Sequence, residues 1–281
     1  MDRTKLAYWN ERAVLHGGMP LASPLRPADD DIAAYRAGVQ HACVGLAQPP
    51  QALLLGATPA LATLPWPAGT RFLAIDWSAL MIKHRWPSRG APADTSFALG
   101  DWRQMPLASQ RFDLVVGDAC YAALGTFADC VRLHEEVWRV LRPGGYFIQR
   151  AVLRPEVPEP LDRLFAQLVA GEIDSMGAFR WRLAMALHGA QGEAVRADRV
   201  YRVWHERVPD AAALLARTGW DARTLALIEG WKGLDVTLPF PSLSEVRDMT
   251  RTHFEVLECR VPTSYALADC CPTLTLRARR A

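Results

Sequence analysis

A series of short apolar segments, each ending before a small or acidic residue, constrains the fold of this chain more than any other feature. They are residues 52–55, 71–75, 97–99 and 112–116, which precede Gly56, Asp76, Gly100 and Gly117. The segments show little alternation of apolar and polar residues, which is typical of strands covered on both faces in a parallel sheet. A fifth apolar segment, residues 146–152, follows the turn Pro143-Gly144-Gly145. The sequence therefore predicts a parallel sheet built from these five strands.

Helical patterns lie on either side of these strands. Ile32, Tyr35 and Val39 recur at steps of three or four residues behind an acidic triplet at 29–31 that can cap a helix. Residues 126–141 carry a second apolar stripe of helical period. Strands that alternate with helices predict crossover connections and a doubly wound sheet, whose ligands bind at the carboxyl ends of the strands.

The rest of the chain divides into a helical insertion and a final unit of the sheet. Residues 156–241 are helical in composition and hold Trp181, Trp204, Trp220 and Trp231, with no strand-turn-strand signature. Residues 242–250 favour a helix, and residues 253–261 and 273–279 favour strands that can pair with each other. We therefore predict an α/β fold with a doubly wound, mostly parallel seven-stranded sheet, a C-terminal antiparallel hairpin and an inserted helical cap. The expected divisions are an N-terminal helical segment or lid at 1–48, a cofactor-binding core at 49–155, a substrate-side cap at 156–241 and the final helix-strand-strand unit at 242–281.

The first strand-to-helix turn, Gly56-Ala57-Thr58-Pro59, restricts the cofactor. Such a turn brings the backbone and the N-terminal amides of a helix to a polar ligand. This one has a single glycine where the dinucleotide fingerprint has three, which argues against NAD and FAD. Asp76 ends the second strand 20 residues after Gly56, where a carboxylate can accept hydrogen bonds from both ribose hydroxyls. The pattern therefore favours an adenosine-containing ligand.

Four more residues suit the adenine ring of such a ligand. Trp77 and Met81 offer flat and polarizable surface directly after Asp76. Asp101 can accept a hydrogen bond from the exocyclic amine, and Trp102 can cover the other face of the ring.

Five stretches of the chain resemble class I S-adenosylmethionine-dependent methyltransferases. They are LLLGATPAL (53–61), FLAID (72–76), LGDWRQMPL (99–107), FDLVVGD (112–118) and VWRVLRPGGYFIQ (137–149). The last, with RVLRPGG ahead of a strand, is the most specific. The resemblance covers residues 50–155 and, more weakly, 242–281, and it implies S-adenosylmethionine as the cofactor of a Rossmann-like methyltransferase. The sequence departs from the family in its first motif, where Ala57-Thr58-Pro59 replaces the usual glycine repeat.

The resemblance also implies roles for individual residues. Gly56 and Thr58 would line the methionine moiety, Asp76 would bind the ribose, Asp101 and Trp102 would contact the adenine, and Asp118 would lie beside the methionine amine. Tyr121, three residues after Asp118, is the candidate for positioning the substrate at the cofactor mouth, with ordinary packing as the alternative. Three histidines are candidate bases, none favoured over the others: His134, His188 and His205.

The N-terminal segment and the cap each have two interpretations. Tyr8-Trp9 can fold over the cofactor as a lid, with Arg26 facing a carboxylate, or can belong to a helix packed on the sheet. The tryptophans of the cap can form an aromatic substrate pocket or the core of a small helical layer.

Composition narrows the partners. The 32 basic and 30 acidic residues are spread along the chain, with no basic block that would track nucleic acid. No apolar stretch approaches the ~18 residues of a membrane span, and the first residues lack the apolar core of a secretory signal, so we expect a cytoplasmic protein. The six cysteines form no CxxC pair, and no metal site is expected.

Three functions remain compatible with the sequence. The first is methyl transfer from S-adenosylmethionine to a small acceptor, an organic acid or an aromatic molecule. The second keeps the cofactor but attacks its aminocarboxypropyl carbon, in a cyclisation or an aminocarboxypropyl transfer that releases methylthioadenosine. The third is a non-catalytic adenosine-binding scaffold.

Overall fold

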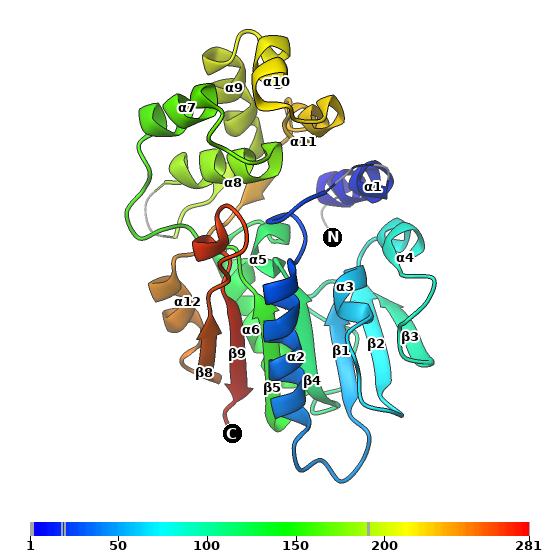
Figure 1. The fold of residues 1–281 in the computed structure, drawn as a ribbon. Helices are drawn as coiled ribbons and strands as arrows, with labels where there is room; N and C mark the ends of the chain where they lie inside the picture. The colour runs from blue at the N-terminus through cyan, green and yellow to red at the C-terminus, as the bar shows by residue number, and fades with distance from the viewer. Residues whose placement is uncertain (1–2, 18, 20, 190–191, 281) are drawn as a thin grey trace.

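A seven-stranded sheet forms the centre of the molecule (Figure 1). The computed structural model describes residues 3–17, 19, 21–189 and 192–280. Five strands run parallel: β1 (Gln51–Leu55), β2 (Arg71–Asp76), β3 (Asp94–Leu99), β4 (Phe112–Asp118) and β5 (Leu141–Arg150). The order is β3-β2-β1-β4-β5-β9-β8, and β9 (Thr273–Ala278) pairs antiparallel with both β5 and β8 (Phe254–Arg260). The predicted doubly wound sheet with a C-terminal antiparallel hairpin is confirmed.

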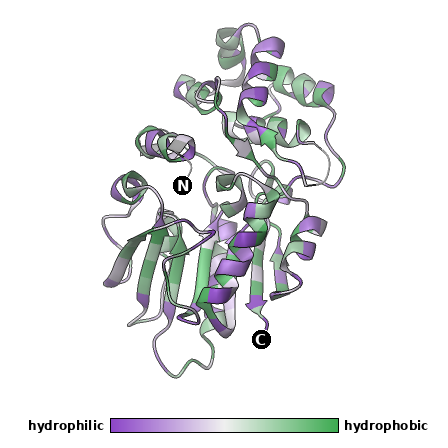
Figure 2. Ribbon diagram, turned by 180° about the vertical axis from the view of Figure 1, so that it is seen from behind, coloured by the Kyte–Doolittle hydropathy of each residue, from purple (hydrophilic) through white to green (hydrophobic). Residues whose placement is uncertain are grey.

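Helices cover both faces of the sheet because consecutive strand residues point to opposite faces. In β1, Ala52 and Leu54 belong to the core cluster that contains Tyr35 of α2 (Asp29–Cys43), whereas Leu53 and Leu55 belong to the cluster that contains residues of α6 (Phe127–Val140). On the α6 side lies also α12 (Leu243–Thr250). Figure 2 shows the strands as largely hydrophobic and the helices as mixed in character, which agrees with this layering.

The helices that directly follow the strand ends nearest the cavity are short. They are α3 (Pro59–Ala62), α4 (Ala79–Arg85) and α5 (Cys120–Ala123). The single turn of α3 begins with Pro59, which has no backbone N–H to offer a ligand. The turn after β1 therefore presents its own loop backbone to the cavity, where the sequence had predicted the amides of a helix N-terminus.

The described residues between β5 and α12 are mainly helical and lie beyond the carboxyl ends of the parallel strands (Figure 1). They form α7 (Leu161–Ala170), α8 (Met176–Ala186), α9 (Ala197–Arg207), α10 (Ala211–Thr218), α11 (Ala226–Glu229) and the 3-10 turn η1 (Ala222–Leu225). They also form an unpredicted two-stranded sheet, β6 (Val195–Arg196) with β7 (Thr237–Leu238). Strands of two residues are too short to leave an alternating pattern in the sequence.

The N-terminal helix, α1 (Arg3–Gly17), packs beside α4 and faces the helical layer, as Figure 1 shows. It does not lie on a face of the sheet, so the second interpretation of the N-terminal segment is wrong in this respect. Near the C-terminus, the 3-10 turn η2 (Ala268–Cys270) connects β8 to β9. Within the described ranges, no helix is both long and apolar enough to cross a membrane.

Candidate cofactor and substrate site

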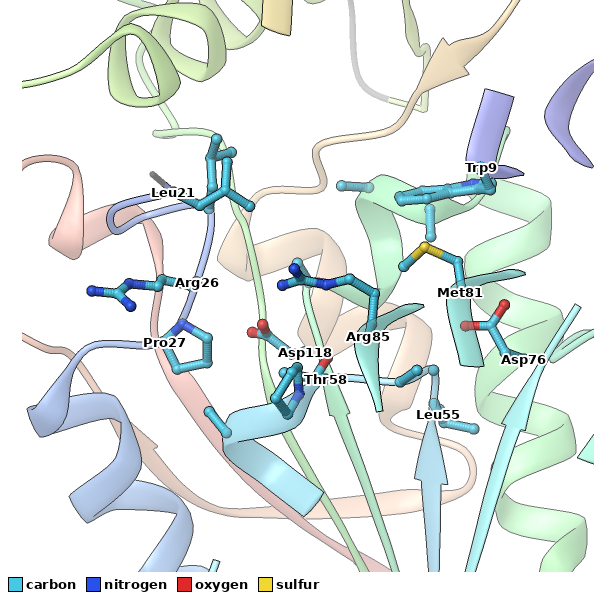
Figure 3. Close-up of a pocket in the computed structure, with 18 of the residues that line it drawn as sticks. Trp9, Leu21, Arg26, Pro27, Leu55, Thr58, Asp76, Met81, Arg85 and Asp118 are labelled. Atoms are coloured by element: carbon cyan, nitrogen blue, oxygen red, sulfur yellow. The ribbon is translucent and has the colours of Figure 1, made fainter. Parts of the chain in front are cut away.

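A cavity of about 370 Å³ lies at the carboxyl ends of the strands, with walls from the N-terminal segment and from the helical layer. Figure 3 shows it with Leu55 and Thr58 at the ends of the central strands and Trp9 on the opposite side. Seven of the eight cofactor residues expected from the sequence line it: Gly56, Thr58, Asp76, Trp77, Met81, Trp102 and Asp118. The strand ends therefore bring together nearly the whole expected set.

Asp76 is held at the end of β2 with its carboxylate buried. The residue is 5% exposed, and its Oδ1 accepts a hydrogen bond from the Ser78 N–H at 2.9 Å. Burial raises the pKa of the Asp76 carboxyl to about 6. Hydrogen bonds from the backbone N–H groups of Ser78 and Trp77 lower this pKa but do not offset the effect of burial. The Ser78 hydroxyl also caps α4 by accepting from the Met81 N–H at 3.0 Å. The start of α4 therefore fixes Asp76 and places Met81 beside it.

Gly56 brings the turn after β1 close to Asp76 and Trp102. Its φ of +91° is strained for any other residue type. A Cβ atom at Gly56 would lie 3.4 Å from the Trp102 indole and 3.7 Å from Asp76 Oδ2. The Trp102 Nε1–H donates to the Ile75 carbonyl at 2.9 Å, which fixes the indole in this position. The Gly56 backbone, the Asp76 carboxylate and the Trp102 indole therefore lie side by side in space, an arrangement that fits the ribose and base of an adenosine.

Asp118, at the end of β4, is held by a fully buried arginine. Arg150 donates from Nε to Asp118 Oδ1 at 2.7 Å and from Nη2 to Oδ2 at 3.2 Å. Arg150 Nη1 also lies 3.5 Å from Asp31 Oδ2. The Tyr35 hydroxyl donates to the Gly117 carbonyl at 2.6 Å and accepts from the Arg150 N–H at 2.7 Å. Arg150 therefore fixes the Asp118 carboxylate at the cavity, where its oxygens can accept hydrogen bonds from the ammonium of a methionine moiety.

Sequence reasoning missed Arg150, Asp31 and Tyr35 as members of this network. One signal was present, because a buried strand that ends in Arg150 places a cation beside the predicted Asp118. Asp31 was read only as part of a helix cap, a role it also has, since its Oδ2 accepts from the Ala28 N–H at 2.8 Å.

Asp101 does not line the cavity. Its carboxylate is engaged by Arg103, whose Nε lies 2.9 Å from Oδ1 and whose Nη2 lies 2.6 Å from Oδ2. Arg103 also donates to Asp129 at 2.8 Å, so the pair belongs to a network between the turn after β3 and α6. Asp101 instead lines a small second pocket together with Trp77 and Trp102, so its contact with adenine stays a prediction.

The expectation that Tyr121 reaches the cofactor mouth is wrong, because the residue is fully buried in α5. Its hydroxyl accepts from Gln149 Nε2 at 2.8 Å and lies 3.1 Å from His134 Nε2. These three side chains sit in the core on the α6 side of the sheet, and Tyr121 is not among the residues that line the cavity. The alternative, ordinary packing, is what the structure shows.

The three candidate histidines lie outside the described lining of the cavity. Burial lowers the pKa of His134 to about 4. The Phe240 backbone N–H donates to His188 Nε2 at 3.4 Å, and His205 Nε2 lies 3.1 Å from Glu229 Oε2. Their positions favour structural roles.

The N-terminal segment contributes much of the opposite wall. Tyr8, Trp9, Leu21 and Arg26 all line the cavity, as the lid interpretation predicts for the first two. Figure 3 shows the Trp9 indole facing Met81. In the same view Arg26 extends away from Asp118, and the expectation that it faces a carboxylate stays a prediction.

Two arginines of the cavity, Arg85 and Arg180, were not predicted from the sequence. Arg85 of α4 points into the cavity (Figure 3), and the helical layer contributes Arg180 and Trp181 of α8 together with Trp231. Trp204 is fully buried in the helical layer and does not line the cavity, so the cap tryptophans divide between the core and the cavity wall.

The fold and the cavity define a Rossmann-like α/β protein whose ligand site lies at the carboxyl ends of its parallel strands. A Rhodobacter sphaeroides structure, provisionally named a zinc-dependent alcohol dehydrogenase, has 14% identity and a TM-score of 0.57, with 100% of each chain covered. A Bordetella parapertussis structure described as a possible exported protein has 16% identity and a TM-score of 0.50, covering 98% of this chain and 79% of that one. At these identities the likeness concerns the fold alone.

Comparison of the sequence with family models identifies a domain over the central strands. Residues 53–149, from β1 to β5, match the family model described as a methyltransferase domain. The chain therefore carries a class I methyltransferase domain, and S-adenosylmethionine is its cofactor. The N-methyltransferase NodS from Bradyrhizobium japonicum, solved with S-adenosyl-L-homocysteine, is 14% identical, with 99% of this chain and 100% of that chain covered and a TM-score of 0.48. No curated protein matches the sequence significantly.

Proposed function

We propose that the protein transfers the methyl group of S-adenosylmethionine to a small molecule bound between the strand ends and the helical layer. The observation that carries this proposal is that one cavity has Gly56, Asp76 and Asp118 on one side and aromatic side chains of α1 and α8 on the other. One side therefore fits the cofactor, and the other side leaves an apolar space for an acceptor.

We assign the cofactor-binding roles by the positions of the residues at the strand ends. Asp76 accepts hydrogen bonds from the ribose hydroxyls, and the backbone at Gly56 and Thr58 faces the methionine moiety. Asp118, fixed by Arg150, lies beside the methionine ammonium. Trp77, Met81 and Trp102 enclose the adenine, whereas Asp101 has no place in this proposal.

The bound cofactor supplies an electrophilic methyl group on its sulfonium. The protein then has to hold the acceptor in line with that methyl group and exclude water, which accounts for most of the rate gain in such a transfer. The indoles of Trp9, Trp181 and Trp231 provide walls for both purposes. Among the described lining residues, Asp76 and Asp118 are the carboxylates, and no histidine is present to act as a base.

Calorimetric titration of the purified protein with S-adenosylmethionine, S-adenosylhomocysteine, methylthioadenosine and NAD tests the site. We expect micromolar binding of the first two ligands and no binding of NAD. Absence of binding in a folded sample would contradict the proposal and favour the scaffold hypothesis.

Product analysis separates methyl transfer from the second sequence-based hypothesis. Turnover by methyl transfer leaves S-adenosylhomocysteine, whereas attack on the aminocarboxypropyl carbon leaves methylthioadenosine. Accumulation of methylthioadenosine with an active acceptor would contradict the proposed reaction but not the proposed cofactor.

A further inference from the structure

Arg180 is a buried cation with an unused hydrogen-bonding edge. It lies near the middle of α8, is 5% exposed and lines the cavity. Its Nη1 donates to the Leu227 carbonyl at 2.8 Å, and its guanidinium carbon lies 4.5 Å from the centre of the Trp231 ring. Its Nε is buried and has no hydrogen-bond partner among the residues that the structure describes.

Two other arginines show what this edge of a guanidinium does in this protein. Arg150 uses Nε and Nη2 to donate to the two oxygens of Asp118, and Arg103 uses the same two atoms for Asp101. Arg180 has the same edge, but within the described ranges no carboxylate forms an ion pair with it. A planar fork of this kind matches the two oxygens of a carboxylate.

The surroundings of Arg180 are positively charged. Arg12 of α1 is 3% exposed, and its Nη1 donates to the Ala226 carbonyl at 3.3 Å. Burial is the main cause that lowers the pKa of Arg180, to about 10, and the charge of Arg12 lowers it as well. Arg180 therefore stays protonated at neutral pH. Burying such charges without a counter-ion is unfavourable, so an anion entering the cavity here gains more from Arg180 than from an exposed arginine.

Tyr8 adds a hydrogen-bond donor beside this cation. Its hydroxyl accepts from Trp231 Nε1 at 3.1 Å, which leaves its own proton to donate. Tyr8 lines the cavity, as do Trp9, Trp181 and Phe240. A ligand at this end therefore meets the positively charged Arg180 side chain and the Tyr8 side chain within aromatic walls, which suits a carboxylate on an apolar, planar body.

We propose that Arg180, assisted by Tyr8, binds the carboxylate of the methyl acceptor, and that this acceptor is a small aromatic acid. The inference rests on the proposed function, because it takes the molecule in this part of the cavity to be the acceptor. With its carboxylate at the α8 side, the rest of the acid extends toward the strand ends, where the cofactor is placed.

The experiment compares acids with their uncharged counterparts. Benzoate and indole-3-acetate, and the primary amide of each, are titrated calorimetrically into the protein saturated with S-adenosylhomocysteine. We expect each acid to bind at least tenfold more tightly than its amide. Arg180→Met should remove this preference and leave the affinity for S-adenosylhomocysteine unchanged.

Two further variants separate charge, geometry and folding. Arg180→Lys keeps the charge but loses the planar fork, so it should retain only part of the preference for acids. Arg182→Met is the matched control, since Arg182 lies on the same helix, pairs with Glu159 and is not among the residues that line the cavity. It should keep the full preference.

The outcomes are distinct. Equal affinity for acid and amide in the unaltered protein, no binding of either, or an unchanged preference in Arg180→Met would overturn the inference. Binding of inorganic phosphate without binding of the acids would overturn the assignment of a carboxylate. If S-adenosylhomocysteine itself fails to bind, the proposed function fails instead, and titration of the acids into the free protein still tests the role of Arg180.

Discussion

The two ends of the cavity carry opposite charges. The strand ends present Asp76 and Asp118, with Arg85 of α4 also in the cavity, whereas α8 presents Arg180. A cofactor with a sulfonium and an ammonium group fits the acidic end, and an anionic acceptor fits the basic end. In the proposed function, the scaffold therefore selects the methyl donor and the helical layer selects the acceptor.

The contrast is sharpest between two buried arginines. Arg150 is fully buried and bound to Asp118, with Asp31 nearby. Arg180 is nearly as buried, yet its only hydrogen-bond acceptor among the described residues is the Leu227 carbonyl. Arg150 therefore has its counter-ions within the protein. In the inference above, the counter-ion of Arg180 is the carboxylate of a bound ligand.

The largest effect is expected for Arg150→Met, because it leaves two buried carboxylates without their cation. We expect a loss of about 3 to 5 kcal/mol in the free energy of unfolding, measured by urea denaturation. Arg142→Met, on the same strand, is the control, since Arg142 is 42% exposed and its pair with Asp113 should contribute at most about 1 kcal/mol. Similar losses in the two variants would contradict the distinction between a buried and an exposed pair.

Asp76→Ala should weaken S-adenosylmethionine binding by at least ~1.5 kcal/mol, because charged hydrogen bonds to the ribose are lost. Calorimetry on the folded variant measures this change. Asp101→Ala is the control at the neighbouring strand end, and it should leave the affinity unchanged because Asp101 faces Arg103. An effect of Asp101→Ala equal to that of Asp76→Ala would support the contact between Asp101 and adenine that the sequence predicts.

Cofactor affinity should depend on pH through Asp76. Its pKa in the free protein is raised to about 6, and the ionised form is the one that accepts two ribose hydrogen bonds. Affinity should therefore be full above about pH 7 and fall as the pH drops through 6, by up to about tenfold per pH unit. Without cofactor, the same group favours the folded state most below its ordinary pKa of 3.8, and that contribution is lost as the pH rises through 6. In Asp76→Asn, which is expected to bind more weakly, this pH dependence should disappear.

The smallest effect is expected for Arg180→Met. Removal of an unpaired buried charge offsets the loss of the hydrogen bond to Leu227, so the melting temperature without ligand should stay the same or rise. Thermal unfolding monitored by circular dichroism checks this. A melting temperature lowered as much as in Arg150→Met would mean that Arg180 is a structural residue.

The strand-end half of the site was largely predictable because it follows local rules. A buried strand followed by Gly56 or Asp76 places that residue at a known edge of the sheet, whatever the rest of the chain does. Asp101 shows the limit of this rule, since Arg103, two residues later, takes its carboxylate. Tyr121 shows a second limit, because a residue near a strand end can turn into the core as easily as into the cavity.

The other half was not predictable because it depends on how separate segments pack together. Arg180 sits in a helix with no apolar stripe that would indicate which side faces inward. Its importance arises from Trp231 and Leu227, about 50 residues further along the chain, and from Arg12 of α1. Such contacts between distant segments leave no periodic signal in the sequence.

The hydrogen bond between Tyr8 and Trp231 joins the N-terminal helix to the segment after α11, 223 residues away, on the same side of the cavity. Tyr8 is synthesised before β1 to β5 and Trp231 after them. Purification tags and truncations near the N-terminus therefore belong among the variables of any binding assay. A protein shortened to start at α2 would keep every strand of the sheet and lose the helix that carries Tyr8 and its side of the cavity wall.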